Sequence, residues 1–181
     1  RRILLGLVGY PIAHSAAPAA HEASAQAIGL EAHDHLIEVP GAGREGLRSI
    51  LDGVRATGFA GVNITYPYKE LAAGLVDELS PDAAAMGAIN TVVVSGGRLI
   101  GHNTDMSGFR TAYDRCVGLR GPRSVAILGA GGVGRAIAHA LARHGGPALR
   151  FYDHDRAKSE DLAGRLPGPA LVTSCVEEVM D

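Results

Sequence analysis

A short apolar strand pattern, a cluster of glycines and an alanine-rich helix pattern follow one another directly between residues 124 and 143. Gly129, Gly131 and Gly134 have the spacing G-x-G-x-x-G, and a second strand pattern ends at Asp153, 24 positions after Gly129. Such glycines let the backbone turn tightly and approach a pyrophosphate, to which the following helix offers free N–H groups. Because strand, loop, helix and acid occur in the required order, we expect a dinucleotide site and not a ligand-free turn. Its expected loop contacts are Gly129, Ala130, Gly131, Gly132, Val133 and Gly134.

The choice of dinucleotide depends on Asp153 and Arg156. A carboxylate at the end of the second strand accepts a hydrogen bond from the free 2′-hydroxyl of NAD and repels the 2′-phosphate of NADP. Arg156 favours the opposite choice if it clamps that phosphate, and it favours neither if it is an ordinary solvated helix residue. The sequence therefore predicts NAD as the cofactor, with NADP as the alternative.

The stretch GVNITYPYKE, residues 61–70, predicts a second ligand site. In a strand, Val62 and Ile64 face one side, and Asn63 and Thr65 face the other. A proline then ends the strand pairing, and Lys69 comes where a helix begins. The polar side chains are therefore expected at the carboxyl end of a strand, where open α/β sheets bind ligands.

The remaining pattern predicts an α/β protein with two domains. Strands are expected over 3–9, 33–39 and 61–66, and helices over 17–28, 41–58 and 69–79. A short helix capped by Ser80, a hairpin over 88–103 and a helix over 104–116 follow. The Gly, Pro and Arg residues of 118–123 indicate a connector. We therefore expect a ligand-binding domain over 1–117 and a partial Rossmann-type, doubly wound domain over 124–181.

Composition excludes several classes of protein. The 181 residues carry a formal net charge of −2, which gives no electrostatic basis for binding nucleic acid or an anionic membrane surface. No run of 18 apolar residues is present, and the first apolar run is broken too early for a signal peptide. Two cysteines, Cys116 and Cys175, favour a reducing compartment and hence the cytoplasm. The eight histidines complete no metal-binding spacing, so no metal is expected.

Five ordered motifs resemble the shikimate and quinate dehydrogenase family. GYPIAHSAAPAAH (9–21) is similar to G-x-P-I-x-H-S-x-S-P-x-x-H, and GVNITYPYK (61–69) is similar to G-x-N-V-T-x-P-x-K. GAINTVV, GHNTDMSGF and the glycine loop GAGGVGRA follow in the family's order. The resemblance implies an enzyme of the shikimate pathway and aromatic amino acid biosynthesis that reversibly oxidises the ring 3-hydroxyl of shikimate or quinate with a nicotinamide cofactor. The acid at the end of the second Rossmann strand resembles the NAD-using branch.

The resemblance also implies roles for individual residues. Lys69 and Asp105 would be the catalytic pair, and Ser15, Thr65 and Asn90 would hold the ring acid, with Asn63 shaping the loop. A lysine is a cation at neutral pH, so we expect the pair to donate to a developing alkoxide, and oxidation to be faster at high pH. The expected partner is a small ring hydroxy acid, and the expected assembly is a monomer or a homodimer.

The chain departs from the family pattern at two places. Ala17 stands where relatives carry Ser or Thr, so an amino-substituted or otherwise modified ring acid is an alternative substrate. The family's chains also continue beyond the position of Asp181 with more cofactor sheet, further Gln and Tyr substrate contacts and a terminal helix, so we interpret the sequence as part of a longer chain. A ligand-sensing homologue without turnover is the alternative from another class, which the presence of both Lys69 and Asp105 disfavours.

Overall fold

The computed structural model describes residues 2–117, 121–142 and 146–180. Contacts divide the chain into two compact units, Arg1–His102 and Asn103–Asp181. Each unit contains a sheet with helices, so the predicted α/β class is confirmed. The units meet between His102 and Asn103, whereas the sequence predicts a boundary at 118–123, so α5 (Asp105–Val117) lies in the second unit instead of the first. Residues 118–120 of the predicted connector lie outside the described residues.

The first unit is built on a six-stranded sheet with the order β2-β1-β3-β5-β6-β4. The strands β1, β2 and β3 are parallel, β5 runs antiparallel to β3 and β6, and β4 is parallel to β6. The strands are β1 (Arg2–Gly9), β2 (Glu31–Glu38), β3 (Phe59–Ile64), β4 (Glu78–Leu79), β5 (Thr91–Ser95) and β6 (Arg98–His102). The helices are α1 (Ala17–Ala27), α2 (Arg44–Ala56), α3 (Lys69–Ala73) and α4 (Pro81–Met86).

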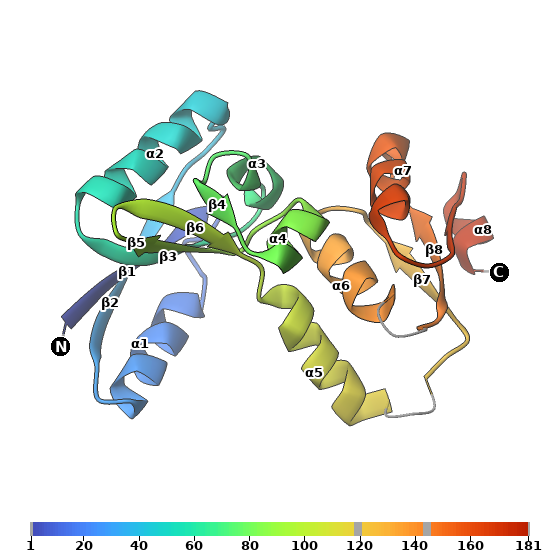
Figure 1. Ribbon diagram of the computed structural model, residues 1–181, viewed down its shortest axis with the longest axis horizontal. Helices are drawn as coiled ribbons and strands as arrows, with labels where there is room; N and C mark the ends of the chain where they lie inside the picture. The colour runs from blue at the N-terminus through green and yellow to red at the C-terminus, as the bar shows by residue number, and fades with distance from the viewer. Residues whose placement is uncertain (1, 118–120, 143–145, 181) are drawn as a thin grey trace. The chain divides into compact units, whose positions relative to one another are not determined.

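The strand order 2-1-3 places α1 and α2 on opposite faces of the sheet (Figure 1). The chain passes from β1 outward to β2 and then back across to β3, and right-handed crossovers in opposite directions cover opposite faces. The carboxyl ends of β1 and β3 are neighbours, with Val8 beside Ile64. The crevice outside these two strand ends is the position at which open α/β sheets bind ligands.

The main apolar core of the first unit lies on the face covered by α2. Leu47, Leu51 and Val54 of α2 are fully buried there against strand residues such as Val62 and Ile64. Within the part of the chain that the structure describes, this cluster includes no side chain from α1. The helix α1 is therefore attached to the opposite face by other contacts.

The helix predicted over 69–79 is wrong beyond Ala73. Gly74 follows the end of α3, and residues 78–79 form β4 along β6. The backbone N–H of Asp77 donates to the carbonyl of Leu99 at 3.0 Å, and the N–H of Leu99 donates to the Asp77 carboxylate at 2.7 Å. Glycine is a poor helix former, and these two bonds hold the segment against the sheet instead.

The second unit contains a parallel sheet with the order β7-β8-β9. Its buried cluster includes Ile127, Leu141, Phe151 and Leu162, and Phe109 and Tyr113 of α5 pack against that cluster, so α5 belongs to this unit. The strands are β7 (Ser124–Leu128), β8 (Ala148–Tyr152) and β9 (Ala170–Val172), and the other helices are α6 (Gly132–Ala142), α7 (Arg156–Arg165) and α8 (Val176–Met180).

Candidate functional site

A pocket of about 660 Å³ lies at the carboxyl ends of β1 and β3. Its walls come from the end of β1, from the loop between β1 and α1, from the first residue of α1 and from the residues after β3. Three residues singled out from the sequence, Ser15, Ala17 and Thr65, line this one pocket. The remaining lining residues are Leu7, Pro11, Ile12, Ala13, His14 and Tyr66. Sequence reasoning missed them as individuals, although most belong to the two motifs that it identified.

Gly9 allows the two loops of the pocket to approach each other. A Cβ atom at this position would lie 2.3 Å from Cγ2 of Thr65 and 3.0 Å from the carbonyl oxygen of Tyr66, so any larger residue would push the loops apart. Two backbone hydrogen bonds hold the approach, from Tyr10 N–H to the Tyr66 carbonyl and from Thr65 N–H to the Val8 carbonyl, each at 2.9 Å. Tyr10–Pro11 and Tyr66–Pro67 are both cis peptide bonds.

Ser15 and Ala17 occupy the turn that leads into α1. The Ser15 hydroxyl accepts a hydrogen bond from the backbone N–H of Ala17 at 3.2 Å. Accepting this bond uses one lone pair of Oγ and leaves the hydroxyl hydrogen for a ligand. Ala17 lines the same pocket but provides only a methyl group there. The pocket can therefore offer the hydroxyls of Ser15 and Thr65 to an anionic or hydroxylated ligand, on an otherwise largely apolar wall.

Lys69 and Asn90 are outside the lining of this pocket but lie on segments that are hydrogen-bonded to each other. The carbonyl of Lys69 accepts from Ile89 N–H at 2.9 Å, and the carbonyl of Asn90 accepts from Ile64 N–H at 2.8 Å. The Asn63 side chain also donates to the Asn90 carbonyl, at 3.2 Å. Asn63 thus connects β3 to the Asn90 segment, and its role in shaping the loop stays a prediction.

Asp105 is the first residue of α5 and therefore belongs to the second unit. Its backbone N–H donates to the side-chain oxygen of Asn103 at 3.0 Å, an arrangement that satisfies an N–H at the start of a helix. A carboxylate in the first turn is also favoured by the helix dipole.

The glycine loop of the second unit connects β7 to α6. Gly129 has a φ of +99°, a region that residues with a Cβ rarely adopt. A Cβ on Gly134 would lie 1.9 Å from the carbonyl oxygen of Gly129, so only glycine permits this close return of the helix against the loop. The tight turn and the approach expected of a pyrophosphate-binding loop are therefore present, and the geometry fits a dinucleotide.

Asp153 follows β8 and is tied directly to this loop. Its Oδ2 accepts from Ala130 N–H at 2.7 Å, and its Oδ1 accepts from Asp155 N–H at 2.9 Å. Burial pushes the pKa of Asp153 upward, but these two N–H groups and the nearby His154 and Lys158 outweigh burial and lower the pKa overall. The group is therefore an anion at neutral pH whose oxygens retain lone pairs for a further donor. The contact with Ala130 has no sequence signal beyond the spacing of the motif.

Arg156 begins α7 and turns toward its own helix, where its Nε lies 2.7 Å from Oε1 of Glu160. Both side chains are more than half exposed, so this ion pair is weak and leaves the arginine able to move. Among residues 2–117, 121–142 and 146–180, no three His, Cys, Asp or Glu side chains gather in a way that could hold a metal ion. In the same residues, no helix is both long and apolar enough to cross a membrane.

Comparison with known proteins identifies the first unit. The family described as "Shikimate dehydrogenase substrate binding domain" matches residues 7–92. Shikimate dehydrogenase (NADP(+)) of Symbiobacterium thermophilum is 42% identical over 164 residues, which are 90% of this chain and 54% of that protein. Quinate/shikimate dehydrogenase (NAD(+)) of Corynebacterium efficiens is 43% identical over 164 residues, 89% of this chain and 58% of that protein.

The solved structure of quinate dehydrogenase from Corynebacterium glutamicum in complex with NAD superimposes with a TM-score of 0.84 at 38% identity, over 96% of this chain and 64% of that one. The chain thus spans less than two thirds of the length of these relatives. The matched region contains the pocket with Ser15, Ala17 and Thr65. Residues 7–92 belong to the family of shikimate dehydrogenase substrate-binding domains, and the chain is similar to shikimate and quinate dehydrogenases along most of its length.

Proposed function

We propose that the protein containing this chain is a dehydrogenase that oxidises the ring 3-hydroxyl of shikimate or quinate with a nicotinamide cofactor. The observation that carries the proposal is the pocket at the ends of β1 and β3, in which Ser15 and Thr65 from two separate motifs lie together. Their hydroxyls suit the carboxylate and hydroxyls of a ring acid, and the apolar residues around them suit the carbon ring.

We assign the proton transfer to Lys69 and Asp105. Loss of a hydride from the alcohol carbon requires that the hydroxyl proton leave or that the oxygen be stabilised as its charge develops. In the oxidation direction the neutral Lys69 amine would accept the hydroxyl proton, and in the reduction direction the Lys69 ammonium group would donate a proton to the developing alkoxide. The Asp105 carboxylate would keep the lysine side chain oriented. A bound nicotinamide ring supplies the hydride acceptor. Asn90 would hold a ring hydroxyl.

We further propose that NAD is preferred over NADP. Asp153 at the end of β8 would accept a hydrogen bond from the ribose 2′-hydroxyl, and its charge, with Asp155 two positions on, would repel a 2′-phosphate. Arg156 is paired only weakly with Glu160, so it is able to turn toward a 2′-phosphate and reduce this preference. Relatives of similar identity are named for NAD or for NADP, so this proposal depends on Asp153 itself. The free cysteines Cys116 and Cys175 suit a cytoplasmic enzyme.

A steady-state assay of the full-length protein tests the whole proposal. Shikimate, quinate and amino-shikimate are each assayed with NAD and with NADP. We expect turnover of shikimate or quinate and a preference for NAD of roughly tenfold to a hundredfold in kcat/KM, the scale of one hydrogen bond to a charged group. Turnover of amino-shikimate alone would assign the pocket to a modified ring acid, which the methyl group of Ala17 favours. Reduction of neither cofactor with any ring acid would contradict the proposal.

A further inference from the structure

The helix α1 has little apolar surface with which to hold the sheet. Its less exposed residues form one face, Ala17, Pro18, His21, Glu22 and Ala25, and of these only Ala25 is fully buried. Ala17, His21 and Ala25 are spaced four residues apart and therefore follow one another along this face. Alanine methyl groups make few contacts, so the helix needs another attachment to keep a fixed position on β1 and β2.

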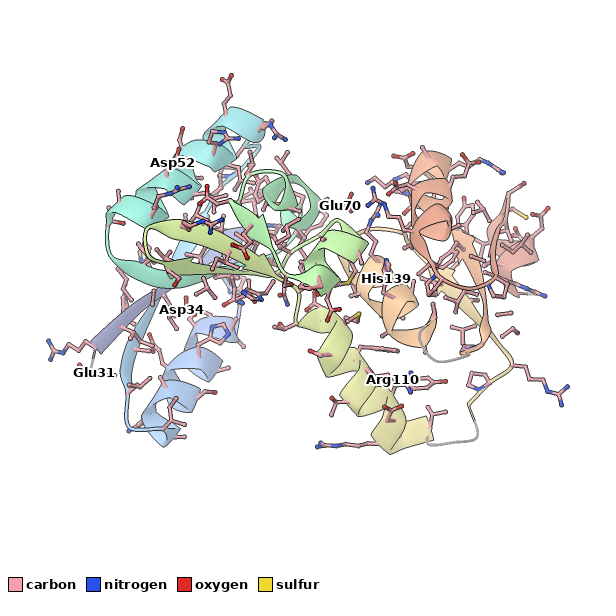
Figure 2. The ribbon with its side chains drawn as sticks, viewed as in Figure 1. Glu31, Asp34, Asp52, Glu70, Arg110 and His139 are labelled. Carbon is pink, nitrogen blue, oxygen red and sulfur yellow. The ribbon has the colours of Figure 1, made fainter. Side chains whose placement is uncertain are left out.

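That attachment is a polar clamp on one residue of β2, which we define as the Asp34 clamp: His21, Glu22 and Asp34. Nδ1 of His21 lies 2.5 Å from Oδ2 of Asp34, and the Asp34 backbone N–H donates to Oε1 of Glu22 at 3.0 Å. Two adjacent residues of α1 thus hold both the side chain and the backbone of one strand residue. Figure 2 labels Asp34 at the side of the sheet where α1 lies.

The clamp has unusual chemistry for a contact between a helix and an edge strand. The Asp34 side chain is completely buried, and its Oδ1 has no hydrogen-bond partner among the described residues. A buried carboxylate is costly unless it is paired, so His21 is essential to keeping Asp34 inside. An ionised carboxylate only accepts hydrogen bonds, so when Asp34 is ionised Nδ1 of His21 is the donor of this bond. Among the described residues, the imidazole of His33 also approaches the clamp, with its Nδ1 3.5 Å from Oε1 of Glu22.

The clamp is one helical turn from the pocket. Ala17, four residues before His21 on the same helix face, lines the pocket, and its N–H is bound to the Ser15 hydroxyl. An α-helix is stiff over one turn, so a shift at His21 moves Ala17 and the Ser15 hydroxyl with it. A displacement of about 1 Å in a group that positions the substrate lowers kcat/KM by up to about a hundredfold.

We propose that His21 and Asp34 are positioning residues, which hold the start of α1 so that the Ser15 hydroxyl meets the ring acid. This inference rests on the proposed function for the identity of the ligand, but the clamp itself is independent of it. Neither residue touches the pocket, so their effect on substrate must pass through the helix.

The first experiment compares His21→Ala with His35→Ala in the full-length protein. His35 is an exposed histidine next to Asp34 on β2, and its side chain points to the opposite face of the sheet from the Asp34 side chain. We expect His21→Ala to raise the KM for the ring acid roughly tenfold while kcat changes less than about twofold, because ligand positioning and not proton transfer is lost. His21→Asn places an amide N–H near the position of Nδ1, and we expect it to restore most of the affinity. Equal kinetics for His21→Ala and His35→Ala would overturn the proposal.

The second experiment measures backbone amide hydrogen exchange without any ligand. The Ser15 N–H is bound to the Ile12 carbonyl at 2.9 Å, and the Asp34 N–H is bound to Glu22, so both amides report on the region around the clamp. We expect faster exchange at both in His21→Ala but not in His35→Ala. Faster exchange at Asp34 with unchanged exchange at Ser15 would show a clamp without a positioning role and would overturn the inference.

A double variant protects the test against misfolding. His21→Ala leaves the Asp34 carboxyl group buried without its partner, whereas the double variant His21→Ala with Asp34→Ala removes both partners. If the two residues act through one contact, the KM of the double variant will be no worse than that of either single variant, and additive effects would argue against the clamp. If the wild-type protein turns over no ring acid, the proposed function fails, but exchange at Ser15 still decides whether the clamp orders the pocket loop.

Discussion

At the scale of single residues, substitution of Lys69 should slow the chemical step and leave substrate binding nearly unchanged. Lys69→Ala is expected to lower kcat by roughly 10²- to 10⁴-fold, the usual contribution of a positioned acid or base, while the substrate KM moves far less. Arg48→Ala, which removes an exposed cation from α2, is the matched control and should leave kcat unchanged. Steady-state kinetics of the full-length protein provide the measurement. A Lys69→Ala variant that keeps most of its kcat would remove the lysine from the mechanism.

Ala17 tests which acid the pocket accepts. Ala17→Ser adds a hydroxyl inside the pocket, and a hydrogen bond to a carboxylate contributes about 1.5–3 kcal/mol where it forms. We expect the KM for shikimate or quinate to fall several-fold if the pocket tolerates the missing hydroxyl. A rise in KM would instead show a pocket shaped for another acid. Ala23→Ser, on the exposed side of the same helix, is the control, and identical kinetics for both variants would mean that position 17 does not contact the substrate.

Asp153 is expected to set the preference for NAD. Asp153→Asn removes the charge that opposes a 2′-phosphate, so the ratio of kcat/KM for NAD to that for NADP should fall, mainly because NADP is used better. Asp114→Asn, an exposed acid on α5, should leave the ratio unchanged. A wild-type enzyme that already favours NADP would show that Arg156 controls this pocket.

The same variant has a second readout in acid. The pKa of Asp153 is lowered in the folded chain, so its carboxylate stabilises the fold at pH values above 3.8, the ordinary pKa of an aspartate. This stabilisation is lost as the pH falls through the lowered pKa of the folded state. The Tm of Asp153→Asn should therefore fall less than that of the wild-type protein between neutral pH and strongly acidic pH. Parallel Tm curves for the two proteins would contradict the lowered pKa.

At the scale of elements, the connection from β7 to α6 depends on the absence of a side chain at Gly134. Gly134→Ala forces a Cβ against the Gly129 carbonyl, at 1.9 Å in the present geometry, and should destabilise the second unit by about 1–3 kcal/mol and weaken dinucleotide binding. Gly164→Ala, within α7, meets nothing within 4 Å and should stabilise its helix by about 0.5–1 kcal/mol. Denaturant unfolding measures both. Equal effects would mean that the close approach is not required.

At the scale of the whole molecule, each unit has its own apolar cluster, and the described residues of the two clusters do not overlap. Leu51 and Leu162 are matched probes, because both are leucines in helices with at most 1% exposure. Replacing either by alanine should cost about 2–5 kcal/mol. We expect calorimetry to show two transitions, with Leu51→Ala lowering one and Leu162→Ala lowering the other. A single transition shifted equally by both variants would show that the two clusters unfold as one.

Sequence alone determined the elements whose causes are local. The glycine loop, the cap at Ser80, the hairpin and the strand that leads to Pro67 follow from side-chain periodicity and backbone preferences, which act over a few residues. The positions of Ser15, Thr65 and Asp153 at strand or helix ends follow in the same way. The boundary at 118–123 has a local basis too, but α5 packs on the second cluster through Phe109 and Tyr113, and no local pattern specifies that contact.

Tertiary structure decided which of these ends meet. The order β2-β1-β3 brings residues 11–17 beside residues 65–66, and it depends on the pairing of strands far apart in the sequence. Residues 78–79 form a strand and not the predicted helix because the segment is bound to β6, in part through Leu99. The burial of Asp34 depends on its contact with His21. An aspartate in an edge strand has no local reason to be buried. It is buried because the packed helix supplies the donor that compensates for the loss of water.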